Sequence, residues 1–205
     1  MNSKKQVLIS QLIQGGWLKT NRVIETFKQI PRENFVLDSH KNYAYADEPL
    51  HILGGQTISA PSMVAVMTEL LKPKATDIVL EVGAGSGYQA AILSRLVKKI
   101  YTIELDHNLA EFAERNLKKT GIKNVEIIIG DGSKGYAKHA PYDKIIMTCA
   151  TQSFPEPLIE QLKINGIILG PLGAEWHQIL TLGIKKKSGL QKKEYMACVF
   201  VPLRH

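Results

Sequence analysis

A glycine-rich turn follows a short run of mostly apolar residues near the middle of the chain. The run covers residues 77–82 and leads into Gly83, Gly85 and Gly87, which alternate with Ala84 and Ser86. Glycine adopts the left-handed conformations that tight turns need, and its bare backbone lets a ligand approach closely. A strand, this turn and then a helix together predict a nucleotide-binding site.

The type of residue after the third glycine indicates which of two kinds of nucleotide ligand the turn binds. The dinucleotide-binding motif needs glycine or alanine at the position of Tyr88, where helix and strand pack closely and the pyrophosphate approaches. A phenol ring at that position excludes the dinucleotide mode. The turn, with Glu81 before it, resembles that of the S-adenosylmethionine (AdoMet) methyltransferases instead. We therefore expect AdoMet as the cofactor, with S-adenosyl-L-homocysteine as its product.

Two further carboxylates stand at the ends of the next predicted strands. Glu104 ends the strand over residues 100–104, and Asp131 follows the strand over residues 125–129. We expect Glu104 to accept hydrogen bonds from ribose hydroxyls and Asp131 from an adenine amino group. A solvated loop acid explains either residue taken singly. Acids at the ends of three successive strands favour a cofactor site.

These residues need a parallel sheet to bring them together. From residue 76 on, strand-like and helix-like segments alternate, which predicts an α/β, Rossmann-like fold with a mostly parallel, doubly wound sheet. The predicted strands cover residues 77–82, 100–104, 125–129, 143–149 and 167–170, and the predicted helices residues 90–97, 107–120 and 157–163. Residues 176–184 and 194–201 predict a C-terminal antiparallel hairpin.

The first 75 residues form an N-terminal helical extension with an irregular loop over residues 42–58. We expect this extension to pack over the carboxyl ends of the strands, where such folds bind ligands. A length of 205 residues fits one methyltransferase domain, with residues 1–75 carrying the substrate loop and residues 76–205 forming the AdoMet-binding core.

Composition excludes several classes of protein. With 44% hydrophobic and 22% charged residues, the chain is neither disordered nor a disulfide scaffold. Residues 1–14 predict an amphipathic helix rather than a signal peptide, and no apolar run is long enough to span a membrane. Cys149 and Cys198 lie in apolar runs without a CxxC pair, so we expect two reduced, buried thiols in a cytoplasmic protein and no metal site.

The net charge of +7 raises the alternative of a nucleic-acid methyltransferase. Lysines on both sides of Ser188 and Gly189 account for much of this excess, and they are typical of a solvated hairpin tip. Enzymes that methylate exocyclic amines carry an Asn/Asp-Pro-Pro-Tyr motif after the fourth strand, where this chain has residues 148–151, Thr-Cys-Ala-Thr. We expect no nucleic-acid partner. An inactive AdoMet-binding protein is a further alternative.

The segment before the glycine turn carries a family resemblance. Residues 54–63 read Gly-Gly-Gln-Thr-Ile-Ser-Ala-Pro-Ser-Met, and Tyr45-Ala-Asp47 precedes them. This segment resembles the signature loop of the protein-L-isoaspartate (D-aspartate) O-methyltransferase family. The resemblance covers nearly the whole chain, through residues 31–35, 80–89, 130–132, 141–143 and 200–203.

The resemblance implies Ser59 as the active-site residue. It also implies a set of cofactor-binding residues: Thr57, Ile58, Ser59, Ala60, Glu81, Gly83, Ala84, Gly85, Ser86, Gly87, Glu104, Leu105, Asp131 and Gly132. The structural alternative for Ser59 is that it only caps a helix starting near Pro61. Two departures from the family stand out: Ser62 replaces a histidine found in some members, and the chain ends at His205, directly after the closing motif.

The resemblance further implies an enzyme that acts on isoaspartyl and D-aspartyl residues of damaged proteins and starts their repair. We expect this enzyme to be a monomer. The acceptor carboxylic acid titrates near about 3.5 to 4, so it is already an anion at neutral pH. Methyl transfer to it then needs no general base, which fits the lack of an evident His or Cys–His base in the sequence. Catalysis would come from placing the carboxylate against the methyl group in line with the leaving sulfur.

Overall fold

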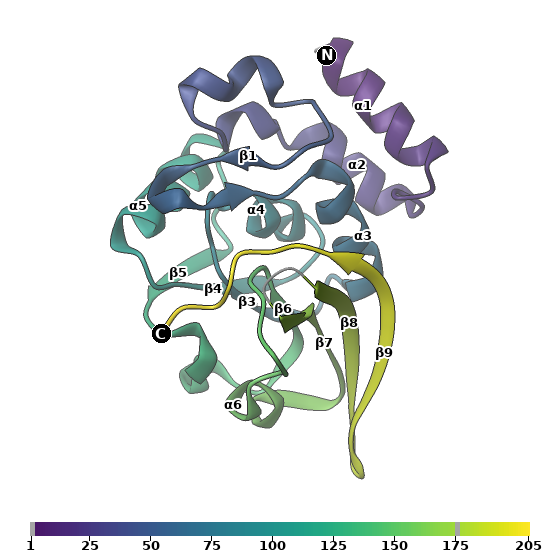
Figure 1. Cartoon of the computed structure of the whole chain (residues 1–205), viewed down its shortest axis with the longest axis vertical. Coiled ribbons are helices and arrows are strands. Elements are labelled where there is room, and N and C mark those ends of the chain that lie inside the picture. Colours follow the sequence, from purple (N-terminus) through teal and green to yellow (C-terminus); the bar gives the residue numbers. More distant parts are fainter. Residues whose placement is uncertain (1–2, 175–176) are drawn as a thin grey trace.

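Seven strands form one twisted sheet in the computed structural model, which describes residues 3–174 and 177–205 (Figure 1). Their order across the sheet is β5-β4-β3-β6-β7-β8-β9. The strands are β3 (Ile78–Val82), β4 (Lys99–Glu104), β5 (Val125–Ile129), β6 (Tyr142–Met147), β7 (Leu162–Ala174), β8 (His177–Lys186) and β9 (Gly189–Cys198). The first five strands in this order, from β5 to β7, run parallel to one another. Strand β8 pairs antiparallel with β7, and β9 pairs antiparallel with β8. The predicted doubly wound sheet with a C-terminal hairpin is confirmed.

The chain reverses direction across the sheet next to β3. It runs from β3 outward through β4 to β5 and then returns to β6 on the other side of β3. In such sheets the crevice at this switch point, outside the carboxyl ends of the strands, is where ligands bind. Strand β3 is buried on both faces, which explains why its sequence is a nearly continuous apolar run.

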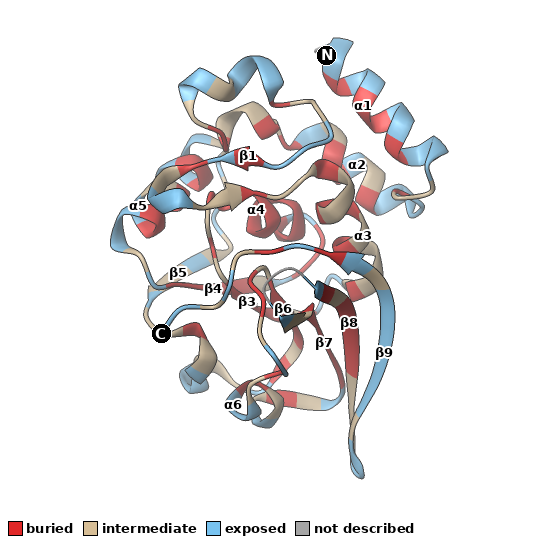
Figure 2. Cartoon of the chain, viewed as in Figure 1, coloured by how far each residue is buried: buried red, intermediate tan, exposed pale blue. Residues whose placement is uncertain are grey.

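Helices pack on both faces of the sheet. They are α1 (Ser3–Gln14), α2 (Asn21–Gln29), α3 (Pro61–Leu71), α4 (Tyr88–Ser94), α5 (His107–Lys119) and α6 (Glu156–Glu160). Helix α4 is buried along its whole length, and the hairpin strand β8 is far more buried than its outer neighbour β9 (Figure 2). Helix α5 is amphipathic, and the Asp106 carboxylate caps it by accepting from the backbone N–H groups of Asn108 and Leu109.

The N-terminal extension carries short segments that the sequence did not reveal. Strands β1 (Leu50–His51) and β2 (Thr57–Ile58) pair antiparallel within the loop that was predicted to be irregular. The 3₁₀ turns η1 (Arg32–Asn34) and η2 (Asp38–Tyr43) precede these strands, and η3 (Leu53–Gly55) connects them. Two-residue strands lack the alternation that marks a strand in a sequence. The loop crosses above the sheet near the carboxyl ends of β3 and β4 (Figure 1).

Several predicted bounds shift in the structure. Helix α4 begins at Tyr88, directly after the last glycine of the turn, instead of at residue 90. Helix α6 is one short turn, and β7 already begins at Leu162, inside the helix predicted over residues 157–163. The hairpin turn lies at residues 187–188, one position before the Ser188-Gly189 turn predicted from the sequence. Residue 176, the first of the predicted hairpin, lies outside the described residues, as do Met1 and Asn2.

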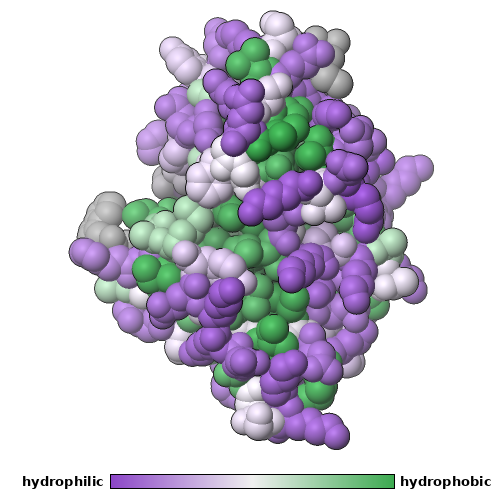
Figure 3. Space-filling model, turned by 90° about the vertical axis from the view of Figure 1, so that its right-hand side faces the viewer, coloured by the Kyte–Doolittle hydropathy of each residue, from purple (hydrophilic) through white to green (hydrophobic). Residues whose placement is uncertain are grey.

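The core lies on both faces of the sheet and includes two free, buried cysteines, Cys149 and Cys198, as expected. The face on the right-hand side of Figure 1 is mostly hydrophilic, with apolar side chains gathered toward its middle (Figure 3). Among the described residues, no helix is both long enough and apolar enough to cross a membrane.

Candidate active site

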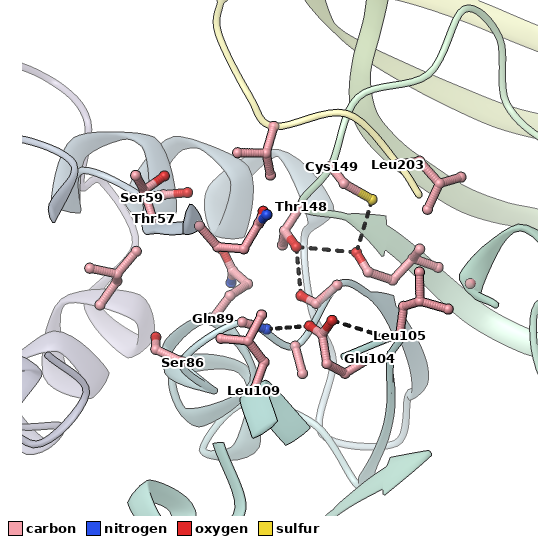
Figure 4. A pocket seen from close by; sticks show the side chains of 18 of the residues that line it. Thr57, Ser59, Ser86, Gln89, Glu104, Leu105, Leu109, Thr148, Cys149 and Leu203 are labelled. Atoms are coloured by element: carbon pink, nitrogen blue, oxygen red, sulfur yellow. Dashed lines mark hydrogen bonds between the residues drawn. The ribbon is translucent and has the colours of Figure 1, made fainter. Parts of the chain in front are cut away.

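A cleft opens at the carboxyl ends of the central strands, beneath the N-terminal loop. Its empty space, which includes the open solvent at its mouth, is about 850 Å³. Its walls come from distant parts of the chain: the signature loop, the glycine turn, the ends of β4 and β6, and the C-terminal segment (Figure 4). The fold thus brings together the two segments that the sequence analysis singled out.

The glycine turn forms the floor of the cleft. Gly83, Gly85 and Gly87 all have positive φ angles, of 94°, 54° and 84°. A Cβ atom on Gly83 would lie 2.5 Å from the Thr148 hydroxyl oxygen, which is too close for any side chain. That hydroxyl donates to the carbonyl oxygen of Gly83 at 2.6 Å. Only glycine therefore fits at position 83, and the floor stays open for a ligand.

Glu104 fastens the floor to the next strand. Its carboxylate accepts hydrogen bonds from the backbone N–H groups of Gly85 at 2.9 Å, Leu105 at 2.9 Å and Asp106 at 3.1 Å. The side chain lines the cleft and is almost fully buried. A carboxylate offers about four acceptor positions, so acceptor capacity remains for a ligand hydroxyl.

Asp131 lies beside the cleft rather than in its lining. Its carboxylate accepts from the backbone N–H of Ser133 at 2.9 Å and from the Ser133 hydroxyl at 2.7 Å. The Ser133 hydroxyl bond is the main reason that the pKa of Asp131 lies below its usual value, with the nearby His205 ring contributing. Its neighbour Gly132 does line the cleft. The role of Asp131 toward adenine stays a prediction.

Ser59 does not cap helix α3, so that alternative is wrong. Ala60 occupies the N-cap position and provides no side-chain bond. The helix start is instead satisfied by Asp47, whose carboxylate accepts from the backbone N–H of Ser62 at 2.8 Å. Ser59 lines the cleft beside Thr57, on the wall across from Glu104 (Figure 4). Within the described part of the chain, its hydroxyl has no hydrogen-bond partner and is available to a ligand.

Most of the predicted site residues meet in the cleft. Those that line it are Thr57, Ile58, Ser59, Gly83, Ala84, Gly85, Ser86, Glu104, Leu105 and Gly132. The others, Ala60, Glu81, Gly87 and Asp131, lie outside the lining. Gly87 instead lets α4 approach α5, because a Cβ there would lie 3.3 Å from the side chain of Ala113.

Several lining residues were missed by the sequence analysis. They are Gln56, Val64, Met67, Val82, Tyr88, Gln89, Ile103, Leu109, Thr148, Cys149, Val201, Pro202, Leu203 and Arg204. Thr148 and Cys149 could have been found, because they end the strand predicted over residues 143–149, at the same edge of the sheet as Glu104. The C-terminal segment carried no such signal. It is held over the cleft by backbone bonds between Ala150 and both Val201 and Leu203, each of 2.8 Å.

Glu81 lies on β3, just before the glycine turn and outside the cleft lining. It pairs in register with Thr102 of β4 and Ile146 of β6, and it is fully buried. Neither carboxylate oxygen has a hydrogen-bond partner among the described residues. Burial raises the pKa of Glu81 to about 8, and the negative charge of Glu104 adds to this increase. At neutral pH the group therefore holds a proton.

This buried acid predicts a pH dependence of stability. Because folding raises the pKa of Glu81, the native state holds a proton that the unfolded chain has released above its ordinary pKa. Stability therefore falls as pH rises from about 5 to about 8, by up to about 1.4 kcal/mol per pH unit, and this contribution levels off above pH 8. Glu81→Gln should remove that slope in urea unfolding, whereas Glu126→Gln, an exposed control, should keep it. If the free energy of unfolding depended on pH in the same way for wild type and Glu81→Gln, a neutral Glu81 would be contradicted.

Comparison with known proteins shows which family the chain belongs to. The family model described as protein-L-isoaspartate(D-aspartate) O-methyltransferase matches residues 2–205. A protein-L-isoaspartate O-methyltransferase of Pyrococcus abyssi is 47% identical over 199 residues, which cover 95% of this chain and 92% of the relative. The chain belongs to this family. The resemblance seen in the sequence is confirmed, and with it an AdoMet-dependent methyltransferase.

Solved structures agree with this assignment. One protein-L-isoaspartate O-methyltransferase superposes with a TM-score of 0.90 at 30% identity, covering 98% of this chain and 66% of the other. A Plasmodium falciparum chain assigned to the same enzyme, solved in complex with S-adenosyl-L-homocysteine, gives a TM-score of 0.87 at 25% identity over nearly the full length of both chains. The residues present fit AdoMet, because the Gly83 floor has no room for a side chain and Glu104 keeps free acceptor capacity at the wall.

Proposed function

We propose that this enzyme transfers the methyl group of AdoMet to the free α-carboxylate of L-isoaspartyl residues, and to the side-chain carboxylate of D-aspartyl residues, in damaged proteins. The resulting ester would cyclise to a succinimide and allow part of the product to return to normal aspartate. The observation that carries the proposal is that the glycine turn and the Ser59 loop line the same cleft. Family membership supports the choice of acceptor.

The chemistry of the cleft suits an acceptor that is already an anion. When bound, AdoMet supplies a methyl group activated by its sulfonium charge. The acceptor oxygen forms its new bond to the methyl carbon while the sulfur keeps the electron pair of the old bond, so no proton needs to move. The lining, drawn from the described residues, contains no histidine or lysine. Burial raises the pKa of the Cys149 thiol to about 12, which leaves it protonated and without a role as base.

The residues of the cleft then act by binding and positioning. We propose that Glu104 accepts from the ribose hydroxyls and that the Ser59 hydroxyl donates to the acceptor carboxylate. The apolar side chains of Leu105, Leu109 and Leu203 enclose the reacting groups. Excluding water strengthens the attraction between the anionic acceptor and the sulfonium centre before they react.

We also propose that residues 1–205 act as one domain and as a monomer in the cytoplasm, without a nucleic-acid partner. The two reduced thiols support a reducing compartment. The lysines of the β8–β9 turn lie at the tip of the hairpin, away from the cleft (Figure 1). A basic tip at that distance does not guide nucleic acid to the methyl group.

Methyl transfer to matched substrates tests the proposed function. An isoaspartyl peptide, its normal aspartyl twin and an RNA pool are each incubated with the enzyme and radiolabelled AdoMet. We expect label in the isoaspartyl peptide, as a base-labile ester, and none in the other two. Label in the RNA would favour the nucleic-acid alternative, and no label anywhere would favour an inactive AdoMet-binding protein.

A further inference from the structure

Arg32 is a fully buried cation next to the signature loop. Its side chain has 0% exposure, although arginine is among the residues least often buried. The guanidinium donates three hydrogen bonds, to the carbonyl oxygens of Ala44 at 2.6 Å, Glu48 at 3.1 Å and Ser59 at 3.1 Å. One side chain thus holds three points of the loop that carries the proposed active-site serine.

Among the described residues Arg32 forms no ion pair, although the nearby charges of Asp47 and Glu48 favour its charged form. Its three partners are neutral carbonyl oxygens, and its guanidinium carbon lies 5.9 Å from the centre of the Tyr88 ring, at the outer limit of a cation–π contact. Its Nε atom is buried without a partner among the described residues. Burying a charge in this way is unfavourable, so the arrangement is expected only where the fixed geometry of the loop matters.

The contacts of Arg32 reach both walls of the cleft. Through the Ser59 carbonyl, Arg32 is joined to the residue that we propose contacts the acceptor. Tyr88, under the guanidinium, lines the same cleft and begins helix α4 directly after the glycine turn. Arg32 therefore lies between the signature loop and the start of helix α4.

Neighbouring bonds reinforce the same loop. The Tyr45 hydroxyl donates to the carboxylate of Glu33, the residue after Arg32. The Asp47 carboxylate accepts from the backbone N–H of Ser62, beyond the other end of the loop. While these two hydrogen bonds remain, loss of the three hydrogen bonds from the Arg32 guanidinium would loosen the position of Ser59 without releasing the whole loop.

We propose that Arg32 is a positioning residue for methyl transfer, which holds Ser59 against the cofactor floor through three carbonyl contacts. The inference rests on the proposed role of Ser59 in binding the acceptor. Its effect should appear in turnover rather than in cofactor binding, because none of the glycine-turn or Glu104 contacts passes through Arg32.

The variant that tests this is Arg32→Lys, which keeps the charge but cannot reproduce the planar fork. We expect kcat/KM for an isoaspartyl peptide to fall by about 10- to 100-fold, mainly in kcat, while the Kd for S-adenosyl-L-homocysteine changes less than about threefold. Hydrogen exchange should speed up at the amides of residues 44–59 and not in the sheet. In Arg32→Ala, added methylguanidine should restore part of kcat.

The matched control is Arg22→Lys, since Arg22 also donates to a backbone carbonyl, that of Leu96, but does not touch the loop. It should keep wild-type kcat. Wild-type kcat and unchanged loop exchange in Arg32→Lys would overturn the proposal, and so would failure of every Arg32 variant to fold, since Arg32 would then serve the whole fold. A wild-type enzyme inactive on the isoaspartyl peptide would instead overturn the proposed function.

Discussion

Replacing Glu104 by alanine should weaken AdoMet binding by about ten- to a hundredfold. The carboxylate holds three backbone N–H groups of the cleft floor and, in the proposed complex, also accepts from the ribose hydroxyls. Its removal takes away a charge-assisted contact with the cofactor and the acceptor that orders Gly85. Both effects act on the bound state, so calorimetry with S-adenosyl-L-homocysteine is the direct measurement.

Two further variants separate binding from general destabilisation. Glu104→Gln keeps the shape but turns an amide NH₂ toward backbone donors, so its loss of affinity should lie between wild type and alanine. Glu126→Ala removes an acid from the neighbouring strand β5 that pairs with Lys99 and lies outside the cleft, and its affinity should be normal. Unchanged affinity in a folded Glu104→Ala would remove this residue from the cofactor site.

Replacing Ser59 by asparagine should leave a stable, cofactor-binding protein that hardly methylates isoaspartyl peptides. One lost hydrogen bond to a charged group corresponds to about ten- to 150-fold in kcat/KM, the loss expected for Ser59→Ala. Asparagine adds bulk within the cleft lining as well. Because Ser59 forms no cap on α3, neither variant should lose the roughly 1 kcal/mol typical of a missing helix cap.

Ser62→Ala is the matched control for Ser59. It removes a hydroxyl three positions along the same segment, outside the cleft lining, and keeps the backbone N–H that bonds to Asp47. We expect normal turnover from it. The readouts are initial methylation rates and urea unfolding of each variant. Normal methyl transfer by Ser59→Asn would exclude Ser59 from acceptor binding.

The cofactor floor is the part of the site that could be predicted best. All three glycines of the turn have positive φ, as expected from their residue type, because backbone sterics are a property of each residue and its neighbours. The place of Glu104 followed from one fold rule, that parallel strands end at a common edge. Its bond to Gly85 confirms that the two meet.

The role of Glu81 toward the cofactor stays a prediction, because it lies outside the cleft lining. Strand alternation puts it on the face opposite to Leu80 and Val82, but β3 is covered on both faces. In such a strand the sequence is apolar throughout, so it does not tell which face opens toward a ligand. The alternative that Ser59 only caps α3 is wrong, because the acceptor at the start of α3 comes from Asp47, in a separate part of the loop.

By itself, the sequence determined the strand–turn–helix unit, the acids at the strand ends and the family loop that carries Ser59, since each depends on short-range sterics or on a contiguous motif. Only the tertiary structure decided that residues 201–204 line the cleft, that Glu81 is fully buried and that Arg32 holds the Ser59 carbonyl. These features come from packing between segments far apart in the chain, where the partner of each polar group is set by the whole fold and not by its neighbours in sequence.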